Sequence, residues 1–319
     1  MAKEGFFDHI ARRASIIAER LELEACHAGT EEAEMNRHIF SATKKNTKAP
    51  KERTVQDILK LCNDPASIVA CLRLITSRLS KSGDAVSIIK TISVWLRCLS
   101  SGDSQFVQLC SDYVNLKIVS QDMSDNCALV FANTGCEYVQ ARLQTFGACK
   151  YEYEKEGSGK TKLISLEPTV MLHQMGALMA QIEVVPKCSD SEVSGIGAEA
   201  CKYLLGQFCG DIFPIFRAMT QGLEVLFQNA AQLQQAESEQ YLMILVRMGK
   251  WVSRMTQLLD QFRPMINTEM LLDPKVPLLS YSTTRANSLH PPHPLSPCSL
   301  ISINSAGCSQ AGQALSRNV

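Results

Sequence analysis

The chain has 319 residues, and its 32 lysine and arginine residues balance its 32 aspartate and glutamate residues, so the formal net charge is zero. This balance argues against a general polyanion binder, including a protein that coats nucleic acid. Apolar residues make up 45% of the chain and aromatic residues only 6%, so a core must rely on aliphatic side chains and methionine, as helical cores often do. The length allows one large or two medium domains.

The 13 cysteines are scattered and form no CxxC pair. Six of them lie among apolar residues at helical spacing, which predicts reduced, buried thiols in a cytosolic protein; they are Cys62, Cys71, Cys98, Cys110, Cys201 and Cys209. The first residues, Met-Ala-Lys-Glu, are not followed by the apolar run of a secretory signal. No apolar segment approaches the roughly 18–20 residues that cross a bilayer, so we expect any membrane contact to be peripheral.

Residues 5–25 have the periodicity of an amphipathic helix. Its apolar face includes Phe6, Phe7, Ile10 and Ile17, and arginines flank that face. This pattern suits a helix that lies in a membrane interface, with the arginines reaching toward phosphates. It suits a first helix packed on a core equally well. We interpret residues 1–30 as this helix followed by a linker.

Helical patterns then follow one another as far as residue 262. We expect helices at about 34–45, 52–62, 65–79, 85–99, 103–119, 124–152, 168–184, 192–208, 211–234 and 237–262. Pro50 follows the break after the first of these, and Asp64 and Asp84 suit N-cap positions. Residues 154–162 and 187–194 have the composition of loops, and no segment shows the alternation typical of strands. The sequence therefore predicts an all-α domain of about ten helices at residues 31–264. Residues 265–319 are rich in serine, proline, asparagine and glycine, which predicts a disordered tail.

The segment from Arg37 to Arg53 concentrates basic side chains in this otherwise balanced chain. Glu52 is its only acid, and the lysines of the segment are Lys44, Lys45, Lys48 and Lys51. One local cluster favours an anionic partner bound at one place. A polyphosphorylated headgroup is well held by lysines and arginines that converge from a helix end and the loop after it. A nonspecific patch for acidic lipid or nucleic acid, or a solvated face without function, would carry the same charges.

The sequence GSGKT at residues 157–161 is the strongest enzyme signal in the chain. A phosphate-binding loop needs a glycine where this chain has Glu154, and it follows a buried strand rather than a charged helical pattern. We interpret the segment as a flexible surface loop; the rival interpretation is a nucleotide-dependent enzyme that relies on Lys160. The six histidines form no catalytic or metal-binding motif, so we expect no enzymatic activity, metal site or cofactor.

The basic segment resembles the lipid motif of the ANTH domain, the N-terminal homology domain of clathrin assembly proteins. The family motif is Lys-Ala-Thr, six residues, then Pro-Lys-x-Lys-His. Here the first part is Ser41-Ala-Thr, and after six residues the second part is Pro50-Lys-Glu-Arg-Thr. Further marks of the family match in order over about residues 35–262; they are Lys90 with Gly102, and Asp211 with Phe216 and Gly222.

The resemblance implies a right-handed superhelical solenoid whose N-terminal part is similar to ENTH and VHS domains. It also implies binding of phosphatidylinositol 4,5-bisphosphate, through Lys51, Arg53, Lys44, Lys45 and Lys48. Ser41 and Thr54 replace a lysine and a histidine of the family motif, which weakens two of its four headgroup contacts. In such families a helix before the motif can insert into the bilayer, which favours that role for Phe6, Phe7, Ile10 and Ile17.

The resemblance further implies a peripheral protein of the plasma membrane, of clathrin-coated pits and of clathrin-coated vesicles, with a role in endocytosis. Its implied partners are clathrin and adaptor proteins, which the family binds through its tail. In some members, vesicle SNARE helices bind the folded domain. Met270-Leu-Leu-Asp resembles an incomplete clathrin-binding peptide, and a chance string fits as well. A helical protein-interaction scaffold that binds no lipid stays open as the alternative.

Overall fold

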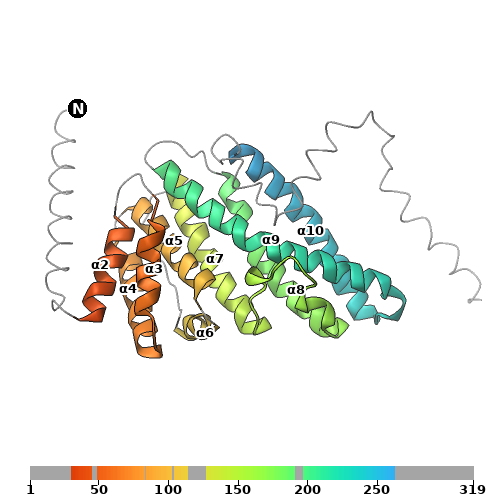
Figure 1. Cartoon of the computed structure of the whole chain (residues 1–319). Coiled ribbons are helices and arrows are strands. Elements are labelled where there is room, and N and C mark those ends of the chain that lie inside the picture. Colours follow the sequence, from red (N-terminus) through yellow and green to blue (C-terminus); the bar gives the residue numbers. More distant parts are fainter. Residues whose placement is uncertain are drawn as a thin grey trace, which may run out of the picture. The chain divides into compact units, whose positions relative to one another are not determined.

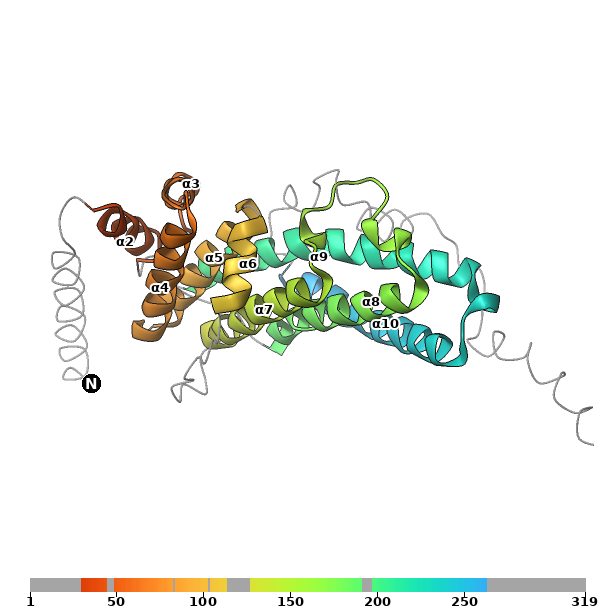
Figure 2. The same cartoon turned by 90° about the horizontal axis from the view of Figure 1, so that it is seen from below.

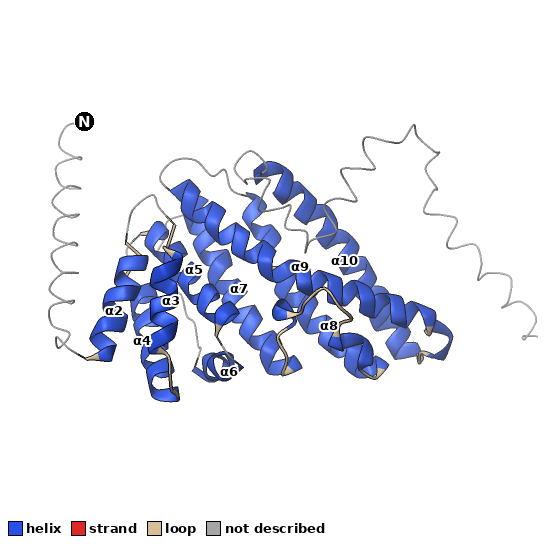
Figure 3. Ribbon diagram, in the orientation of Figure 1, coloured by secondary structure: helices blue, strands red, loops and turns tan. Residues whose placement is uncertain are grey.

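The computed structural model describes residues 30–44, 49–82, 84–102, 104–113, 127–190 and 197–262. Within these ranges the chain forms nine α-helices and short 3-10 helices but no strand (Figure 3), which confirms the predicted all-α class. The α-helices are α2 (Glu31–Ala42), α3 (Glu52–Leu61), α4 (Pro65–Lys81), α5 (Ala85–Ser101), α6 (Ser104–Tyr113), α7 (Cys127–Cys149), α8 (Pro168–Ile182), α9 (Ala198–Gln228) and α10 (Gln235–Phe262). Three of the 3-10 helices are η1 (Tyr153–Lys155), η2 (Lys162–Ser165) and η3 (Val185–Asp190).

The first turns of α4 and α5 begin where the sequence predicts. The Asp64 carboxylate accepts hydrogen bonds from the amides of Ala66 and Ser67, and the Ser67 hydroxyl accepts one from the Asp64 amide. This capping box satisfies amides that a helix start leaves without partners. Asp84 caps α5 in the same way, because its carboxylate accepts from the Ser87 amide at 2.9 Å.

Helix α2 lies about three residues earlier than the predicted helix 34–45. It begins at Glu31 because the Thr30 hydroxyl accepts from the Ala33 amide, and because three glutamates in the first turn suit the positive end of the helix. It ends at Ala42, where the amide and hydroxyl of Thr43 both donate to the Ile39 carbonyl. The sequence pattern places the end of this helix too late, because nothing in the sequence indicates that the Thr43 side chain will donate back to the last turn.

Helix α9 replaces two predicted helices, 192–208 and 211–234, with one helix of 31 residues that contains Pro214. A proline in a helix interior removes one hydrogen bond and costs about 3 kcal/mol. Here Phe208, Ile212 and Ile215 are fully buried on both sides of the proline. Continuous burial of this kind offsets the local cost. The predicted helix 211–234 already ran through Pro214; the sequence pattern missed that the helix also continues across Cys209 and Gly210, where it placed a break.

The helices pack in chain order, as Figures 1 and 2 show, with α2, α3 and α4 at one end of the stack. The helices α5, α7, α8 and α10 follow one another, and α9 runs along α5, α7 and α8. The largest fully buried hydrophobic side chains of this core include Trp95, Phe106, Phe131, Tyr138, Tyr153 and Phe208. The junction between α2 and α3 therefore lies at the N-terminal end of the stack.

Other sequence predictions have mixed outcomes. Of the six cysteines expected to be buried, five are buried and Cys62 is half-buried, and all six are free thiols. The predicted loop 154–162 contains parts of η1 and η2. None of the helices in the described ranges is long and apolar enough to cross a membrane. Several predicted features lie outside the described residues; they are the amphipathic helix with Phe6, Phe7, Ile10 and Ile17, the loop lysines Lys45 and Lys48, the segment 114–126 and the tail 265–319.

Candidate functional site

The start of α3 carries two cations of the predicted site. Lys51 is the N-cap residue and Arg53 lies in the first turn, and both side chains are exposed. Among the described residues neither of them forms an ion pair. The Lys51 side chain has no acceptor atom, so this N-cap residue makes no side-chain capping hydrogen bond to α3. The first amides of a helix lack internal partners, and the helix dipole favours an anion beside them.

The other described members of the predicted site lie at the end of α2 and in the first turn of α3. Ser41 and Lys44 are exposed, and the Lys44 ammonium lies 5.6 Å from the centre of the Phe40 ring. Thr54 is half-buried in the first turn of α3, where its amide donates to the Lys51 carbonyl. Helices α2 and α3 pack against each other, so these residues lie on two neighbouring segments, at the end of α2 and at the start of α3.

Residues from α4 fix the end of α2. Thr43 is fully buried, and its hydroxyl accepts a 3.0 Å hydrogen bond from the Arg78 Nε. The Arg78 guanidinium also lies 4.9 Å from the centre of the Phe40 ring, a distance typical of a cation–π contact. This arrangement immobilises the turn that presents Lys44.

Helix α5 contacts both sides of the junction. The Lys90 Nζ donates a 2.8 Å hydrogen bond to the Lys44 carbonyl, and the Lys90 side chain is 1% exposed. The Arg97 Nη2 lies 2.6 Å from the Glu52 Oε1. The sequence analysis named Lys90 only as a mark of the family and did not mention Arg78 or Arg97. A second signal at Lys90 points to a buried contact, because a single cation in the apolar run from Val86 to Leu96 needs a specific partner.

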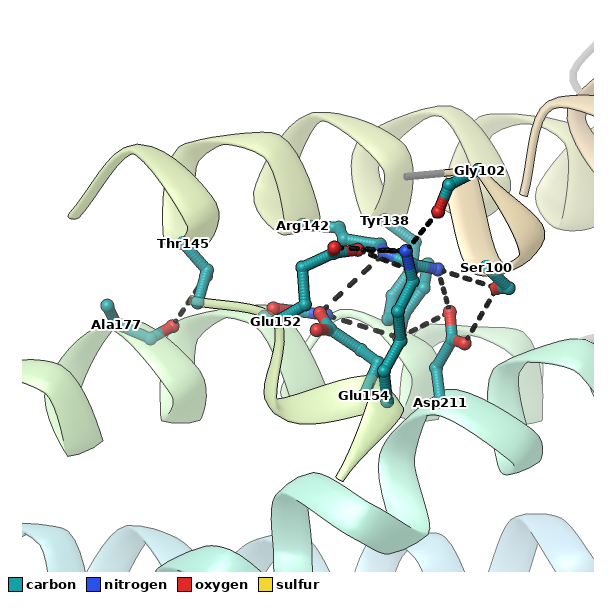
Figure 4. A network of polar contacts seen from close by, with 11 residues as sticks. Ser100, Gly102, Tyr138, Arg142, Thr145, Glu152, Glu154, Ala177 and Asp211 are labelled. Carbon is teal, nitrogen blue, oxygen red and sulfur yellow. Dashed lines mark hydrogen bonds and ion pairs between the residues drawn. The ribbon is translucent and has the colours of Figure 1, made fainter. Parts of the chain in front are cut away.

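A second concentration of charge lies inside the stack (Figure 4). The Arg142 guanidinium is 1% exposed, and its Nη1 contacts the Asp211 carboxylate at 2.6 Å and the Ser100 hydroxyl at 3.1 Å. Two further carboxylates, of Glu154 and Glu152, lie 3.7 and 3.9 Å from the same guanidinium. The network joins α5, α7, α9 and the segment around η1, and it accounts for Asp211, one of the family marks.

Burial changes the proton affinities in this network. It raises the pKa of Asp211 to about 6, although the Arg142 charge acts in the opposite direction. Burial also raises the pKa of Glu152, while Lys155 lowers it through a hydrogen bond. Burial disfavours the charge of Arg142, but Asp211 and Glu154 raise the pKa of this guanidinium above its usual value. A charge cluster so enclosed joins several elements of the fold and presents little charge to a ligand.

The GSGKT segment lies in a surface loop between η1 and η2, and within the described ranges no strand precedes it. Arg217 from α9 donates hydrogen bonds to the carbonyls of Glu156 and Gly157. Gln221 accepts a hydrogen bond from the Thr161 amide at 3.0 Å. Lys160 is exposed. The loop thus directs some of its main-chain groups toward α9, an arrangement unlike a set of amides surrounding a phosphate.

Comparison with known proteins identifies the family. The ANTH domain model matches residues 34–285, which is most of the chain. The chain belongs to the ANTH domain family. It is 23% identical over 274 residues to one putative clathrin assembly protein of Arabidopsis thaliana, and 23% identical over 244 residues to a second. These matches cover 76% and 70% of this chain but 45% and 41% of the relatives, so the chain spans less than half the length of the curated relatives it matches.

Solved structures support the same fold. One is the cryo-EM structure of helical ANTH and ENTH tubules on membranes that contain PI(4,5)P2. It aligns with a TM-score of 0.55 and 13% identity over 77% of this chain and 95% of the other. Another is the ENTH domain from epsin-2 in complex with phosphatidylinositol 4,5-bisphosphate. It aligns with a TM-score of 0.51 and 17% identity over 74% of this chain and 96% of the other. At these identities the likeness concerns the fold alone.

Proposed function

We propose that this ANTH protein is a non-enzymatic peripheral membrane adaptor that binds phosphatidylinositol 4,5-bisphosphate through the α2–α3 junction. The observation that carries the proposal is the pair of exposed cations, Lys51 and Arg53, at a helix start that no side chain caps. Family membership and the lipid named for two structures of the same fold support it.

The chemistry of the junction suits a headgroup with several phosphates. Lys51 and Arg53 from α3 and Lys44 from the end of α2 supply cations in the described part of the site, and Lys45 and Lys48 add two more in the sequence between them. Each such cation near an anionic leaflet contributes about 1 kcal/mol. Ser41 and Thr54 supply hydroxyl groups where the family motif has a lysine and a histidine. We therefore expect weaker headgroup binding than the full motif would give.

The proposal extends to the membrane and the coat. Phe6, Phe7, Ile10 and Ile17 would enter the bilayer interface and add apolar burial to the electrostatic attraction. Recruitment to the cytosolic face of the plasma membrane would concentrate clathrin and adaptor proteins at coated pits and vesicles during endocytosis. The names of the curated relatives, putative clathrin assembly proteins, support this assignment.

A second candidate function follows from the outer face of α10. This face exposes large apolar side chains, each between 37% and 59% exposed; Leu242, Leu245, Val246 and Val252 share one stripe at helical spacing, and Met243 lies to one side of it. Apolar rows on a soluble protein commonly mark an interaction surface. Their helical spacing suits an amphipathic helix such as a vesicle SNARE helix. Without lipid binding, the same face would support the alternative of a helical protein-interaction scaffold.

Vesicle sedimentation separates these functions. The full chain is mixed with phosphatidylcholine vesicles, with and without phosphatidylinositol 4,5-bisphosphate. The variant Lys51→Glu/Arg53→Glu is compared with Lys60→Glu/Arg73→Glu, a control that reverses two exposed cations on α3 and α4. We expect the wild type and the control to sediment only with the bisphosphate lipid, and the first variant to stay in solution. Equal behaviour of the two variants would reject the lipid site and leave the scaffold function.

A further inference from the structure

Helix α5 connects to both halves of the basic motif. Near its start, Lys90 donates to the carbonyl of Lys44, the last described residue before the loop. Seven residues later, Arg97 pairs with Glu52, the first residue of α3. Seven residues are almost two turns, so the two side chains leave the same face of α5 about 10 Å apart along its axis. The two contacts fix the last part of α2 and the first turn of α3 on one rigid helix.

The contact between Arg97 and Glu52 matters because of the charge of Glu52. It is the only acid in the basic segment and lies between Lys51 and Arg53 in sequence. A bare carboxylate at this place would repel a phosphate group and would attract the neighbouring cations. Here the Gln56 amide group donates to Glu52 at 2.9 Å, and Arg97 contacts the same oxygen at 2.6 Å. The carboxylate is thus engaged by α5 and by the next turn of α3.

Lysine is rarely found at a position as buried as that of Lys90. An ammonium group loses much of its hydration on burial, and an apolar side chain would fill the same space at lower cost. Lys90 is 1% exposed and still directs its Nζ to a main-chain carbonyl. A carbonyl can be held in this way only by a donor, and a charged donor holds it more strongly than a neutral one.

We propose that Lys90 and Arg97 are positioning residues of the phosphoinositide site. Lys90 fixes the main chain at Lys44, and Arg97 draws the Glu52 carboxylate toward α5 and offsets its charge. Neither side chain needs to contact the headgroup. This inference rests on the proposed function, because it names the residues that prepare the same site for its ligand.

A charge-rescue experiment tests the role of Arg97. Arg97→Met leaves the Glu52 carboxylate without its cation, and we expect headgroup binding to weaken about fivefold, the effect of one charge near the site. Adding Glu52→Gln to Arg97→Met removes the exposed acid and is expected to return the affinity to within about twofold of wild type. A merely structural role of Arg97 would give no such rescue. Glu52→Gln alone leaves Arg97 without its acid and adds one net positive charge near the site, so we expect it to bind at least as tightly as wild type.

A pH profile tests the role of Lys90. Burial lowers the pKa of Lys90 to about 8, while Asp84 at the start of the same helix raises it. The neighbouring elements contribute Lys44 from α2, Glu52 from α3 and Arg78 from α4. We expect binding to weaken between about pH 7 and pH 9, because the neutral amine holds the Lys44 carbonyl less strongly. Phosphate groups do not lose charge as the pH rises, so the headgroup cannot cause this loss.

The substitutions at Lys90 separate charge from packing. Lys90→Arg keeps its charge throughout this range, so we expect wild-type binding at pH 7 and no loss at pH 9. Lys90→Met is expected to bind weakly at both. Lys60→Met serves as the control for charge number, because it removes one cation from the far end of α3, where Lys60 pairs with Asp57. Binding of this control is expected to stay within about twofold of wild type.

The measurements use the full chain. Isothermal titration with inositol 1,4,5-trisphosphate reports the headgroup alone, and sedimentation with vesicles that contain phosphatidylinositol 4,5-bisphosphate reports the lipid. Absence of binding by the wild type in both assays would reject the proposed function itself. If the wild type binds and Arg97→Met binds equally well, the inference is overturned and the proposed function stays intact. The same holds if Arg97→Met binds more weakly and adding Glu52→Gln does not restore the affinity. If Arg97→Met does not fold, Arg97→Gln replaces it in the same comparison: a loss of binding that Glu52→Gln restores supports the inference, and a loss that Glu52→Gln does not restore overturns it.

Discussion

Replacing Arg142 with methionine is expected to destabilise the fold by about 3–5 kcal/mol near neutral pH, the usual cost of removing one partner from a buried ion pair. The Arg142 guanidinium lies 2.6 Å from the Asp211 carboxylate and within 4 Å of Glu152 and Glu154. Without it, the pair of Lys155 with Glu152 is the ion pair that remains for these three largely buried carboxylates in the described part of the chain. A loss of this size is a large part of the roughly 5–15 kcal/mol that keeps a typical domain folded.

The cost should depend on pH in a defined direction. Burial raises the pKa of Asp211 in the folded protein to about 6, above its ordinary value of 3.8. A raised pKa means that the folded state gains stability from the bound proton; this contribution is complete below about pH 4 and is lost as the pH rises through 6. Arg142→Met removes the charge that lowers this pKa, so the folded variant holds the proton more tightly. The variant should therefore lose less stability at about pH 5 than at about pH 8.

Urea unfolding followed by circular dichroism at both pH values measures the difference in the free energy of unfolding. Arg247→Met is the matched control, because Arg247 forms a two-contact pair with Glu183 in which both side chains are about one-third exposed. Such a pair contributes about 1 kcal/mol or less. The reasoning is refuted if the two variants lose the same stability, or if the loss in Arg142→Met does not change with pH.

Three further predictions each concern the substitution of one residue. Gly102→Ala should destabilise by about 1–3 kcal/mol in urea unfolding, because an added Cβ would lie 2.6 Å from the Cys98 carbonyl, which is main chain and cannot turn aside. Trp251→Phe should cost about 1–3 kcal/mol in the same assay, because the indole donates a buried 2.8 Å hydrogen bond to the Ile182 carbonyl. Lys160→Ala should change neither thermal stability nor vesicle binding, and the wild type should bind neither ATP nor GTP in a filter-binding assay. Nucleotide binding that depends on Lys160 would restore the enzyme interpretation.

Most helices of this fold could be predicted because their signals are local. Apolar periodicity and the caps at Asp64 and Asp84 placed α4 and α5 to within about two residues. The failures have a different cause. Helix α9 continues across Cys209 and Gly210, where the pattern placed a break, because Phe208, Cys209 and Ile212 are buried, and that burial is set by residues far away in the sequence. Local pattern cannot show that packing carries a helix past a glycine.

The same distinction applies to the candidate site. A dense run of charge identified Lys51 and Arg53, because exposed cations need no partner to be recognised in a sequence. Arg78, Lys90 and Arg97 contact the junction across 35, 46 and 45 residues, respectively. Such pairs cannot be read from one sequence, since nothing local says which acid or carbonyl a distant cation will meet.

Glu52 links the empty and the occupied forms of the proposed site. An acid in the first turn of a helix stabilises the positive helix end, which is the place where a phosphate would also bind. In the free protein Glu52 can serve this end of α3 and pair with Arg97 at the same time. When a phosphate binds at this helix end, the Glu52 carboxylate stays paired with Arg97, and this pairing reduces its repulsion of the phosphate. Because the Arg97 and Glu52 side chains are 34% and 52% exposed, salt screens their attraction. The difference in headgroup affinity between wild type and Arg97→Met should therefore shrink as ionic strength rises, whereas a difference caused by lost packing would persist.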